Sequence, residues 1–573
     1  MKNLEKNFIL KINSNTIMLF LVIVSGQLFA QNNDKPKLIL QITVDQLRGD
    51  LPDKFMKNMG EGGFRYLKEN GIWFHNAHYG HANTETVVGH TTLATGADPA
   101  VHGMISNVWF DRETGKLNYN IEDPRYHILS EGSDVDEDTE LDSSQILAST
   151  DGRSPANILV TTFSDELRMT TFGKAKIFGV SVKDRGAVTL AGHTGKAFWF
   201  SKASNEFITS SYYYDKNPKW VDKWNKSKKA SQYGDKSWEL LVDTSKYEFA
   251  NHDDQAWEMD VAGFGTTFPH KYGPSDGKYL GNFLIYSPAG DELTLDFAKS
   301  LIIAEEIGQD DITDFLAISF SSTDYVGHLF GPSSLEAEDN MLRLDRTLAD
   351  LFSYIDNHVG LENTLIVLSA DHGGPEAPGY LKSMGINSGY VSPNKWDKEP
   401  AIERLKEQFG IGQELILDFF PPYVYLNHDV INEKGLDLEE VQNAISKELM
   451  KIEGVSLAIS SESLRNNSMP NTYLYRKALR NFNYKRSGDI LILLSPQYFF
   501  NDFDGEIVAA NHGGPWMYDS YVPVIFAGWK LKGKEVNRRI EPKDIAITLS
   551  NLMGTKPPSG ADGEVLTEII TYK

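Results

Sequence analysis

The chain has 573 residues, of which 41% are hydrophobic and 11% aromatic, so it can form one large globular enzyme or several domains. Its formal net charge of −23 argues against nucleic acid or an anionic membrane surface as a partner, because like charges repel at long range. Cysteine is absent, which excludes disulfides and thiolate metal ligands.

The first thirty residues have the layout of a secretory signal peptide. A basic start precedes an apolar run at 17–24, and Ala30 stands at the expected cleavage point before a polar stretch. The apolar run is too short to span a bilayer. We therefore expect residues 1–30 to be removed and the mature chain, 31–573, to be periplasmic or secreted without a stable membrane anchor.

Several short apolar, β-branched runs end abruptly in polar residues, as expected for strands that are buried on both faces of a sheet. In chain order they cover Leu38–Val44, Lys176–Val182, Asp314–Phe320, Thr364–Leu368 and Tyr521–Phe526. Amphipathic helical patterns lie at Leu293–Ile307, Ser334–His358, Leu438–Ile452 and Ile545–Met553. This alternation predicts an α/β fold with a mostly parallel central sheet flanked by helices. Ligands of such sheets collect at the carboxyl ends of the strands.

Two long stretches interrupt the alternation, at about 185–291 and about 373–511. The first is rich in Tyr, Trp, Lys and Gly, and the second has helical and strand patterns of its own. Long functional loops in compact domains are usually lids. We therefore expect both stretches to be inserted segments that cap the active site.

Potential metal ligands follow three of the predicted strands, and one more histidine comes late in the chain. Each of them alone is more often a cap, a turn residue or a structural histidine. Together, at one edge of a sheet, they would be enough for two sites of three ligands each. Oxygen and nitrogen ligands without sulfur suit catalytic zinc, with manganese and iron as alternatives. The six residues are Asp45, Asp324, His328, Asp371, His372 and His512.

The segment 81–96 is predicted to be a loop that leads into a helix, with Thr86 near the helix start. Backbone N–H groups and the helix dipole favour an anion at such a position, so the Thr86 hydroxyl is well placed as a phosphoryl nucleophile. The alternative is that Thr84 or Thr86 only caps the helix. A metal ion would be needed to ionise the hydroxyl at neutral pH.

The order of these motifs resembles that of the alkaline phosphatase superfamily. From about Lys37 nearly to the C-terminus, the sequence is similar to the bacterial alkaline phosphatases of the PafA type, which use a threonine nucleophile. Besides the ligands, the similarity covers Gly62–Phe64, Thr86–His90, Gly103–Asp111, Lys183–Arg185, Ala197–Phe200 and Tyr484–Asp489. The sequence departs from the family pattern mainly after His372 and after His512, which leaves the leaving-group preference open.

The resemblance implies two Zn²⁺ ions as cofactors and a role for each matched residue. The ligands of the zinc that faces the leaving oxygen would be Asp324, His328 and His512. The ligands of the other zinc would be Asp45, Asp371, His372 and the oxygen of Thr86. The residues around the transferred phosphoryl group would be Asn107, Lys183 and Arg185.

The implied activity is zinc-dependent hydrolysis of small phosphate monoesters through a phosphothreonine at Thr86, with release of inorganic phosphate. A phosphodiesterase or nucleotide pyrophosphatase on the same scaffold is the alternative. Two zinc ions, three ligand aspartates and an ionised Thr86 sum to zero charge, and Lys183 and Arg185 raise the sum to plus two. A monoester carries more negative charge than a diester, so these fixed cations favour the monoester.

Three other functions agree less well with the sequence. A sulfatase usually makes its nucleophile from Cys or Ser, whereas the matching residue here is Thr86. A cytosolic phosphoglycerate mutase would not carry a signal peptide, and a binding protein on an inactive scaffold would lack a ligand or the nucleophile. The sequence leaves the natural substrate and the oligomeric state open, with a monomer favoured.

Overall fold

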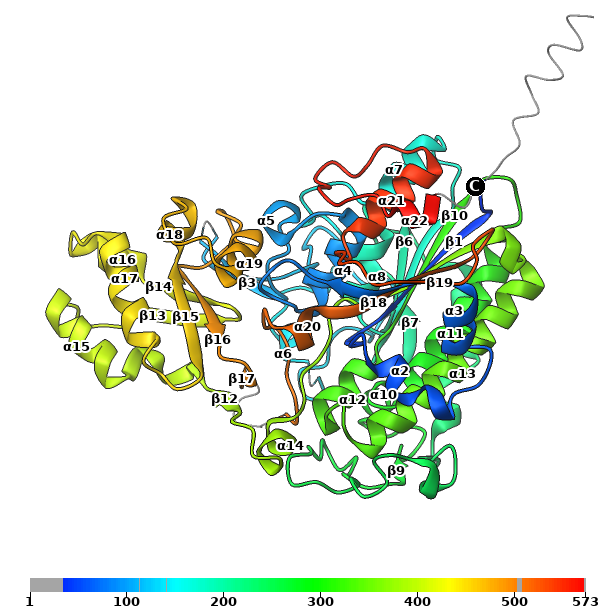
Figure 1. Ribbon diagram of the computed structural model, residues 1–573, viewed down its shortest axis with the longest axis horizontal. Helices are drawn as coiled ribbons and strands as arrows, with labels where there is room; N and C mark the ends of the chain where they lie inside the picture. Colours follow the sequence, from blue (N-terminus) through cyan, green and yellow to red (C-terminus); the bar gives the residue numbers. More distant parts are fainter. Residues whose placement is uncertain (1–34, 113, 141, 502–507, 571–573) are drawn as a thin grey trace, which may run out of the picture. The chain divides into compact units, whose positions relative to one another are not determined.

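The computed structural model describes residues 35–570 except 113, 141 and 502–507 (Figure 1). The signal peptide predicted at 1–30 therefore lies outside the described residues. Within the described part of the chain, we find no helix with the length and apolar character needed to cross a membrane.

A nine-stranded sheet forms the centre of the fold, and helices lie on both of its faces (Figure 1). Five neighbouring strands, β11, β1, β10, β5 and β6, run parallel, whereas β18 and β7 are antiparallel to the strands they pair with. The predicted α/β fold with a mostly parallel sheet is therefore confirmed. In spatial order the strands are β19 (Lys534–Val536), β2 (Ile72–His78), β18 (Tyr521–Gly528), β11 (Thr364–Ser369), β1 (Leu38–Val44), β10 (Asp314–Phe320), β5 (Ile177–Ser181), β6 (Lys196–Ser201) and β7 (Glu206–Ile208).

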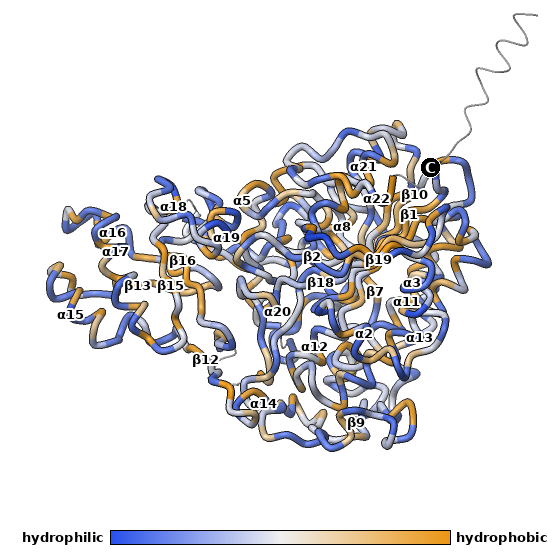
Figure 2. The backbone as a smooth tube through the Cα atoms, viewed as in Figure 1, coloured by the Kyte–Doolittle hydropathy of each residue, from blue (hydrophilic) through white to orange (hydrophobic). Residues whose placement is uncertain are grey.

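The central strands are buried along their whole length. Every residue of β1, β10 and β11 is buried, as the continuous apolar runs predict for strands covered on both faces. Figure 2 colours the tube through β1 and β10 mostly orange, for hydrophobic residues. One layer of helices comprises α4 (Thr86–Thr95), α7 (Phe163–Thr170), α8 (Asp184–Ala191) and α21 (Asp544–Met553). The other comprises α3 (Phe64–Asn70), α11 (Ala289–Ala304), α12 (Ser322–Phe330) and α13 (Leu335–His358).

The register of the parallel strands brings three chain segments to one edge of the sheet. Val44 is opposite Phe320, and Thr43 is opposite both Ser319 and Ser369. The carboxyl ends of these three strands therefore lie side by side, and the residues that follow them leave the sheet at the same edge. The predicted metal ligands after β1, β10 and β11 thus begin at a common edge.

The first predicted insertion, 185–291, was wrong at its start. Residues 196–201 form β6, which pairs in parallel with β5, and 206–208 form β7, so the central sheet continues through this part of the chain. Helix α8 connects β5 to β6 as an ordinary crossover helix. The apolar run Ala197–Phe200 is the strand signal, and it is fully buried in the sheet.

The second predicted insertion, 373–511, contains an antiparallel sheet of its own. In spatial order its strands are β13 (Ile416–Phe420), β14 (Tyr423–Leu426), β16 (Ile490–Leu494) and β15 (Val455–Ser460), with helices α15 (Pro400–Phe409) and α17 (Leu438–Leu449). Alternate residues of β14 and β16 belong to different cores. Tyr423 and Leu491 join a core with Val87 and Val88 of α4, whereas Val424 and the neighbouring even-numbered residues pack with α15 and α17. One face of this small sheet therefore belongs to the same hydrophobic core as the helix that begins at Thr86.

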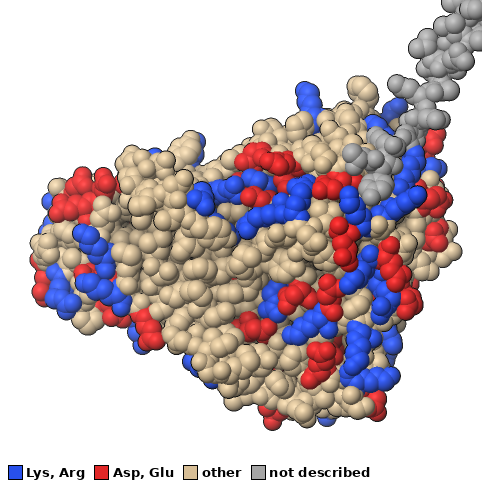
Figure 3. Space-filling view, viewed as in Figure 1, with Lys and Arg blue, Asp and Glu red and all other residues tan. Residues whose placement is uncertain are grey.

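Charged side chains are mixed on the face of the molecule drawn in Figure 3. Lys and Arg side chains lie among Asp and Glu side chains, and no continuous basic stripe crosses the described part of this face. Such a stripe is the usual footprint of nucleic-acid binding. On this face the described acidic and basic side chains are interspersed, in a chain whose formal net charge is −23.

Candidate metal centre and active site

Four separate chain segments deliver the six predicted ligands. Asp45 follows β1, Asp324 and His328 lie one helical turn apart on α12, and Asp371 and His372 follow β11. His512 comes from the end of the second inserted segment. The side chains of Asp45, Asp371 and His372 have no exposed surface, and Asp324 is 2% exposed.

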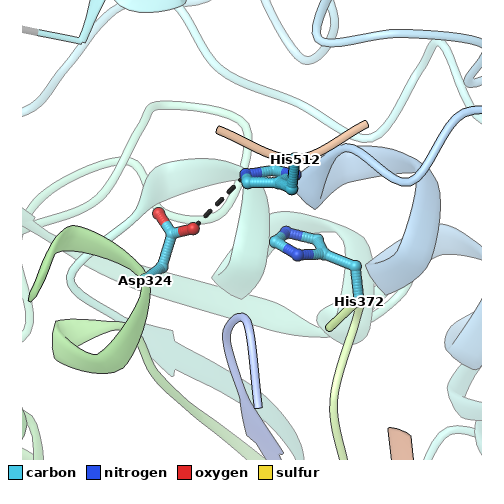
Figure 4. Close-up of side chains that lie close together, drawn as sticks. All are labelled: Asp324, His372 and His512. Atoms are coloured by element: carbon cyan, nitrogen blue, oxygen red, sulfur yellow. Dashed lines mark ion pairs between the residues drawn. The ribbon is translucent and has the colours of Figure 1, made fainter. Parts of the chain in front are cut away.

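The first ligand set converges on one carboxylate oxygen. Asp324 Oδ1 lies 3.3 Å from His328 Nε2 and 3.4 Å from His512 Nε2. Figure 4 shows Asp324, His372 and His512 pointing toward one another from different segments, with the Asp324–His512 ion pair dashed. The three residues predicted to share one cation are therefore together.

The second ligand set converges on His372. Its Nε2 lies 3.3 Å from Asp45 Oδ1 and 3.4 Å from Asp371 Oδ2. The rings of His372 and His512 stack with their centroids 3.7 Å apart, so the two sets are adjacent. By ligand-atom spacing, His372 also groups with Asp324 and His512, which places it between the two sets.

All three histidines are held in the tautomer that leaves Nε2 for a cation. The Nδ1 atoms of His328, His372 and His512 each lie 2.9 Å from a backbone carbonyl oxygen, those of Ala510, Gly373 and Thr84 respectively. A carbonyl oxygen only accepts hydrogen bonds, so Nδ1 carries the proton of the neutral ring and Nε2 is the atom that faces the carboxylates. This second layer of contacts is typical of metal-binding histidines.

Asp45 Oδ1 and His372 Nε2 are among the buried ligand atoms that lack a hydrogen-bond partner in the described part of the chain. Burial lowers the pKa of His372, but the carboxylates of Asp371 and Asp45 outweigh it and raise that pKa to about 9. Burial and the charge of His372 lower the pKa of His512 to about 3. A divalent cation would satisfy the orphaned atoms and the concentrated negative charge, so the residues fit a metal centre.

Lys183 lies between the two ligand sets. Its Nζ is 2.7 Å from Asp45 Oδ2 and 2.5 Å from Asp324 Oδ2. Burial lowers the pKa of this ammonium, but the two carboxylates, Asp324 first, raise it above its usual value. Lys183 is therefore a fixed positive charge that touches one carboxylate of each set.

Thr86 is the first residue of α4 and is 1% exposed. The helix has no side-chain capping hydrogen bond at its N-cap, Glu85, and the Thr84 hydroxyl instead donates to the Gly514 carbonyl at 3.0 Å. Thr84 therefore does not cap the helix, in contrast to the alternative left open by the sequence. Asn107 is adjacent, since its Oδ1 accepts from the Val87 N–H at 3.2 Å, which leaves the Nδ2 end as its donor.

Arg185 has a buried carboxylate partner that the sequence analysis missed. Its Nη1 donates to Asp142 Oδ2 at 2.7 Å, and the Tyr119 hydroxyl lies 3.4 Å from the same nitrogen. Burial raises the pKa of Asp142, but Arg185 and other cations outweigh it and lower that pKa to about 2, so Asp142 is ionised. Including Asp142 lowers the local charge sum from plus two to plus one. No local sequence signal links Asp142 to a residue 43 positions away.

Gln46 and His90 contact the aspartates of the two ligand sets, and neither residue was assigned a role from the sequence. Gln46 has a left-handed backbone, with φ of 61°, and its Nε2 donates to Asp324 Oδ1 at 2.9 Å while its N–H donates to Asp371 Oδ1 at 3.2 Å. His90 Nδ1 lies 3.0 Å from Asp371 Oδ2. Gln46 thus links one aspartate of each set, and His90 ties α4 to Asp371.

A cavity of about 130 Å³ adjoins these groups. Residues of all three roles predicted from the sequence line it: the nucleophile, the phosphoryl-contacting residues and the first ligand set. They are Thr86, Asn107, Lys183, Arg185, Asp324, His328 and His512. The three remaining ligands are not among its lining residues, in keeping with their full burial.

The family model described as type I phosphodiesterase / nucleotide pyrophosphatase matches residues 39–515. The chain is 35% identical over 564 residues to "Alkaline phosphatase PafA" of Elizabethkingia meningoseptica, covering 96% of this chain and 98% of that protein. It is 33% identical to "Alkaline phosphatase PhoV" of Synechococcus elongatus, covering 96% of this chain and 95% of that protein. The crystal structure of wild type alkaline phosphatase PafA superposes with a TM-score of 0.84 at 34% identity, covering 93% of this chain and 99% of that one. The chain therefore belongs to the type I phosphodiesterase / nucleotide pyrophosphatase family, within the alkaline phosphatase superfamily.

Proposed function

We propose that this phosphate monoester hydrolase works with two zinc ions and with Thr86 as its nucleophile. The activity itself follows from its similarity to several alkaline phosphatases over nearly the full chain. The metal identity and number, the residue roles and the covalent intermediate are our proposal.

The spacing of the ligand atoms is the observation that carries the proposal. A tetrahedral zinc with bonds of about 2.0–2.1 Å has ligand atoms about 3.3–3.4 Å apart. The four carboxylate–imidazole separations in the two sets are 3.3, 3.4, 3.3 and 3.4 Å. A set of hydrogen-bonded side chains without a cation would bring these atoms closer, to about 2.7–2.9 Å.

The ligands of one zinc would be Asp324, His328 and His512, and those of the other Asp45, Asp371, His372 and the Thr86 oxygen. When bound, the metals would favour the ionised Thr86 hydroxyl and stabilise negative charge on the leaving oxygen. The negative charges of the Thr86 oxygen and the leaving oxygen would then lie in a buried site, where electrostatic stabilisation is strongest.

The reaction has two displacements at phosphorus. Thr86 Oγ1 forms a bond to phosphorus as the bond to the leaving oxygen breaks, which gives a phosphothreonine and the free alcohol. Water then forms a bond to phosphorus, the bond to Thr86 breaks, and inorganic phosphate leaves. Asn107 Nδ2, Lys183 and Arg185 would stabilise the equatorial oxygens in both steps.

The monoester preference has support from the charges that line the cavity. Two cations, Lys183 and Arg185, line the cavity together with the carboxylates of Asp142 and Glu85, so the formal charge sum with two zinc ions bound would be zero. The support therefore comes from the position of the two cations beside Thr86 and Asn107, which line the same cavity, and not from a net excess of charge. A solved variant of alkaline phosphatase PafA replaces one threonine, one asparagine, one lysine and one arginine. The same four residue types line the cavity here, which supports their proposed roles.

Thr86→Ala tests the proposal. We expect it to lose most turnover of an aryl phosphate while it keeps its zinc content and circular dichroism spectrum. Thr244→Ala, at an exposed threonine, is the matched control. Undiminished turnover by Thr86→Ala would remove the residue from the mechanism.

We also propose that the protein is exported. The basic start, short apolar run and Ala30 of the N-terminal sequence support a cleaved signal peptide and a periplasmic or secreted enzyme. N-terminal sequencing of the mature protein tests this, and an uncleaved N-terminus in a cell fraction that retains cytosolic markers would contradict it.

A further inference from the structure

One part of the cavity wall is apolar and takes no part in the proposed reaction. Met259, Val261, Leu329, Phe500 and Val508 line it together with the catalytic groups. They come from three distant parts of the chain, so no single sequence motif marks them. An apolar wall with a few convergent polar groups is the usual form of a site that selects a small molecule.

Parts of the apolar wall are joined to the backbone at His328, a proposed ligand of the first set. Leu329 follows His328 directly, and its carbonyl accepts from the Met259 N–H at 2.9 Å. Next to Val508, the Ala509 N–H donates to the His328 carbonyl at 2.8 Å. The first ligand set is the one expected to face the leaving oxygen. The apolar wall therefore lies on the side from which the leaving group departs.

Within the described lining residues, no Lys or Arg belongs to the apolar wall itself. Among the described residues that line the cavity, Lys183 and Arg185 are the lysine and arginine, and both are held by carboxylates. Both are also proposed to contact the oxygens of the transferred phosphoryl group and not the leaving group. A charged or strongly polar leaving group would lose hydration against the apolar wall without gaining a cationic partner.

We infer that this enzyme selects phosphate monoesters whose leaving group is an apolar chain or ring. The inference rests on the proposed monoester hydrolysis and specifies its substrate class. Apolar contact with the leaving group is present before and during the reaction, so it raises kcat/KM mainly through KM. Full burial of a methylene corresponds to about a fourfold gain in affinity, and half burial to about a twofold gain.

A series of primary n-alkyl phosphates from methyl to hexyl phosphate tests this inference. Their leaving alcohols have similar acidity, so chemical reactivity stays nearly constant while apolar area grows. We expect kcat/KM to rise by about twofold per methylene, and by tenfold or more across the series. A hexose phosphate with a primary-alcohol leaving group should be hydrolysed at least tenfold less efficiently than hexyl phosphate.

Wall variants show whether these residues cause the selectivity. Met259→Gln and Val508→Thr keep side-chain size and add polarity, and Met384→Gln at an exposed methionine is the control. The readout is the ratio of hexyl to methyl phosphate kcat/KM within each protein, so a general loss of activity cancels. We expect the ratio to fall at least threefold in the wall variants and to stay at the wild-type value in the control.

The possible failures are distinguishable. Hydrolysis of methyl phosphate with no rise along the alkyl series would overturn the inference and leave the proposed function standing. A rise that persists unchanged in both wall variants would also overturn it. If no member of the series is hydrolysed by the zinc-loaded enzyme, the proposed function fails and the inference fails with it.

Discussion

Replacing Gly89 with alanine perturbs the contact between the helix that carries the proposed nucleophile and Asp371, a proposed metal ligand. Helix α4 carries Thr86 and meets the backbone of Asp371 at Gly89, where a Cβ atom would lie 1.8 Å from the Asp371 carbonyl oxygen. Ordinary contacts of a Cβ begin at 3.4 Å, so the two backbones must separate by about 1.6 Å to reach one. Neither backbone can move aside as a flexible side chain could.

This separation displaces Thr86 from the ligand set that holds Asp371. A misplacement of about 1 Å at a reacting group can cost about 10²-fold in rate. We therefore expect kcat/KM of Gly89→Ala for an aryl phosphate to fall by about 10²-fold or more, with a stability loss of about 1–3 kcal/mol from overpacking.

Steady-state kinetics of zinc-loaded Gly89→Ala, with a thermal melt on the same sample, measures both effects. Gly412→Ala is the matched control, because a Cβ there meets nothing within 4 Å and its φ is not positive. If Gly89→Ala keeps kcat/KM within threefold of wild type, the close approach of α4 to Asp371 does not position Thr86 and the reasoning fails.

Three further changes test the charges of the site. Asp142→Asn should lower kcat/KM for monoesters by about tenfold, because Arg185 loses the carboxylate that orients it. A variant with the kcat/KM of the wild type would refute this prediction. Lys183→Ala combined with Arg185→Ala should reduce monoester hydrolysis far more than diester hydrolysis, and equal losses would undo the charge argument. Because the pKa of His372 is raised to about 9, zinc must displace a proton from it at lower pH. The apparent zinc affinity of the chelated protein should therefore fall about tenfold per pH unit from 9 to 7 in calorimetric titrations, and pH-independent affinity would contradict this.

Five of the six proposed ligands could be predicted from sequence because each follows a visible strand or lies on the helix just after one. The runs before Asp45, Asp324 and Asp371 are apolar and β-branched, and their burial on both faces fixes where the following residues emerge. His512 follows no strand of the sheet, and only the resemblance to a known family connects it with the others. The strand β6 was missed because the run Ala197–Phe200 is short and opens a long irregular stretch.

The supporting residues could not be predicted, for physical reasons specific to each. Gln46 reaches both aspartates from a left-handed backbone conformation, which the sequence around a glutamine does not predict. Gly327 leaves room for it, since a Cβ there would lie 1.9 Å from Gln46 Oε1, yet the two residues are remote in sequence. Asp142 lies in an acidic loop where many carboxylates are alike, and only the fold selects the one that meets Arg185.

Anomalous diffraction at the zinc edge, from crystals of the zinc-loaded protein with inorganic phosphate, tests the central claim most directly. We expect two peaks, one contacted by Asp324, His328 and His512 and the other by Asp45, Asp371 and His372, with the Thr86 oxygen beside the second. A single peak, or a second peak remote from Thr86, would contradict it.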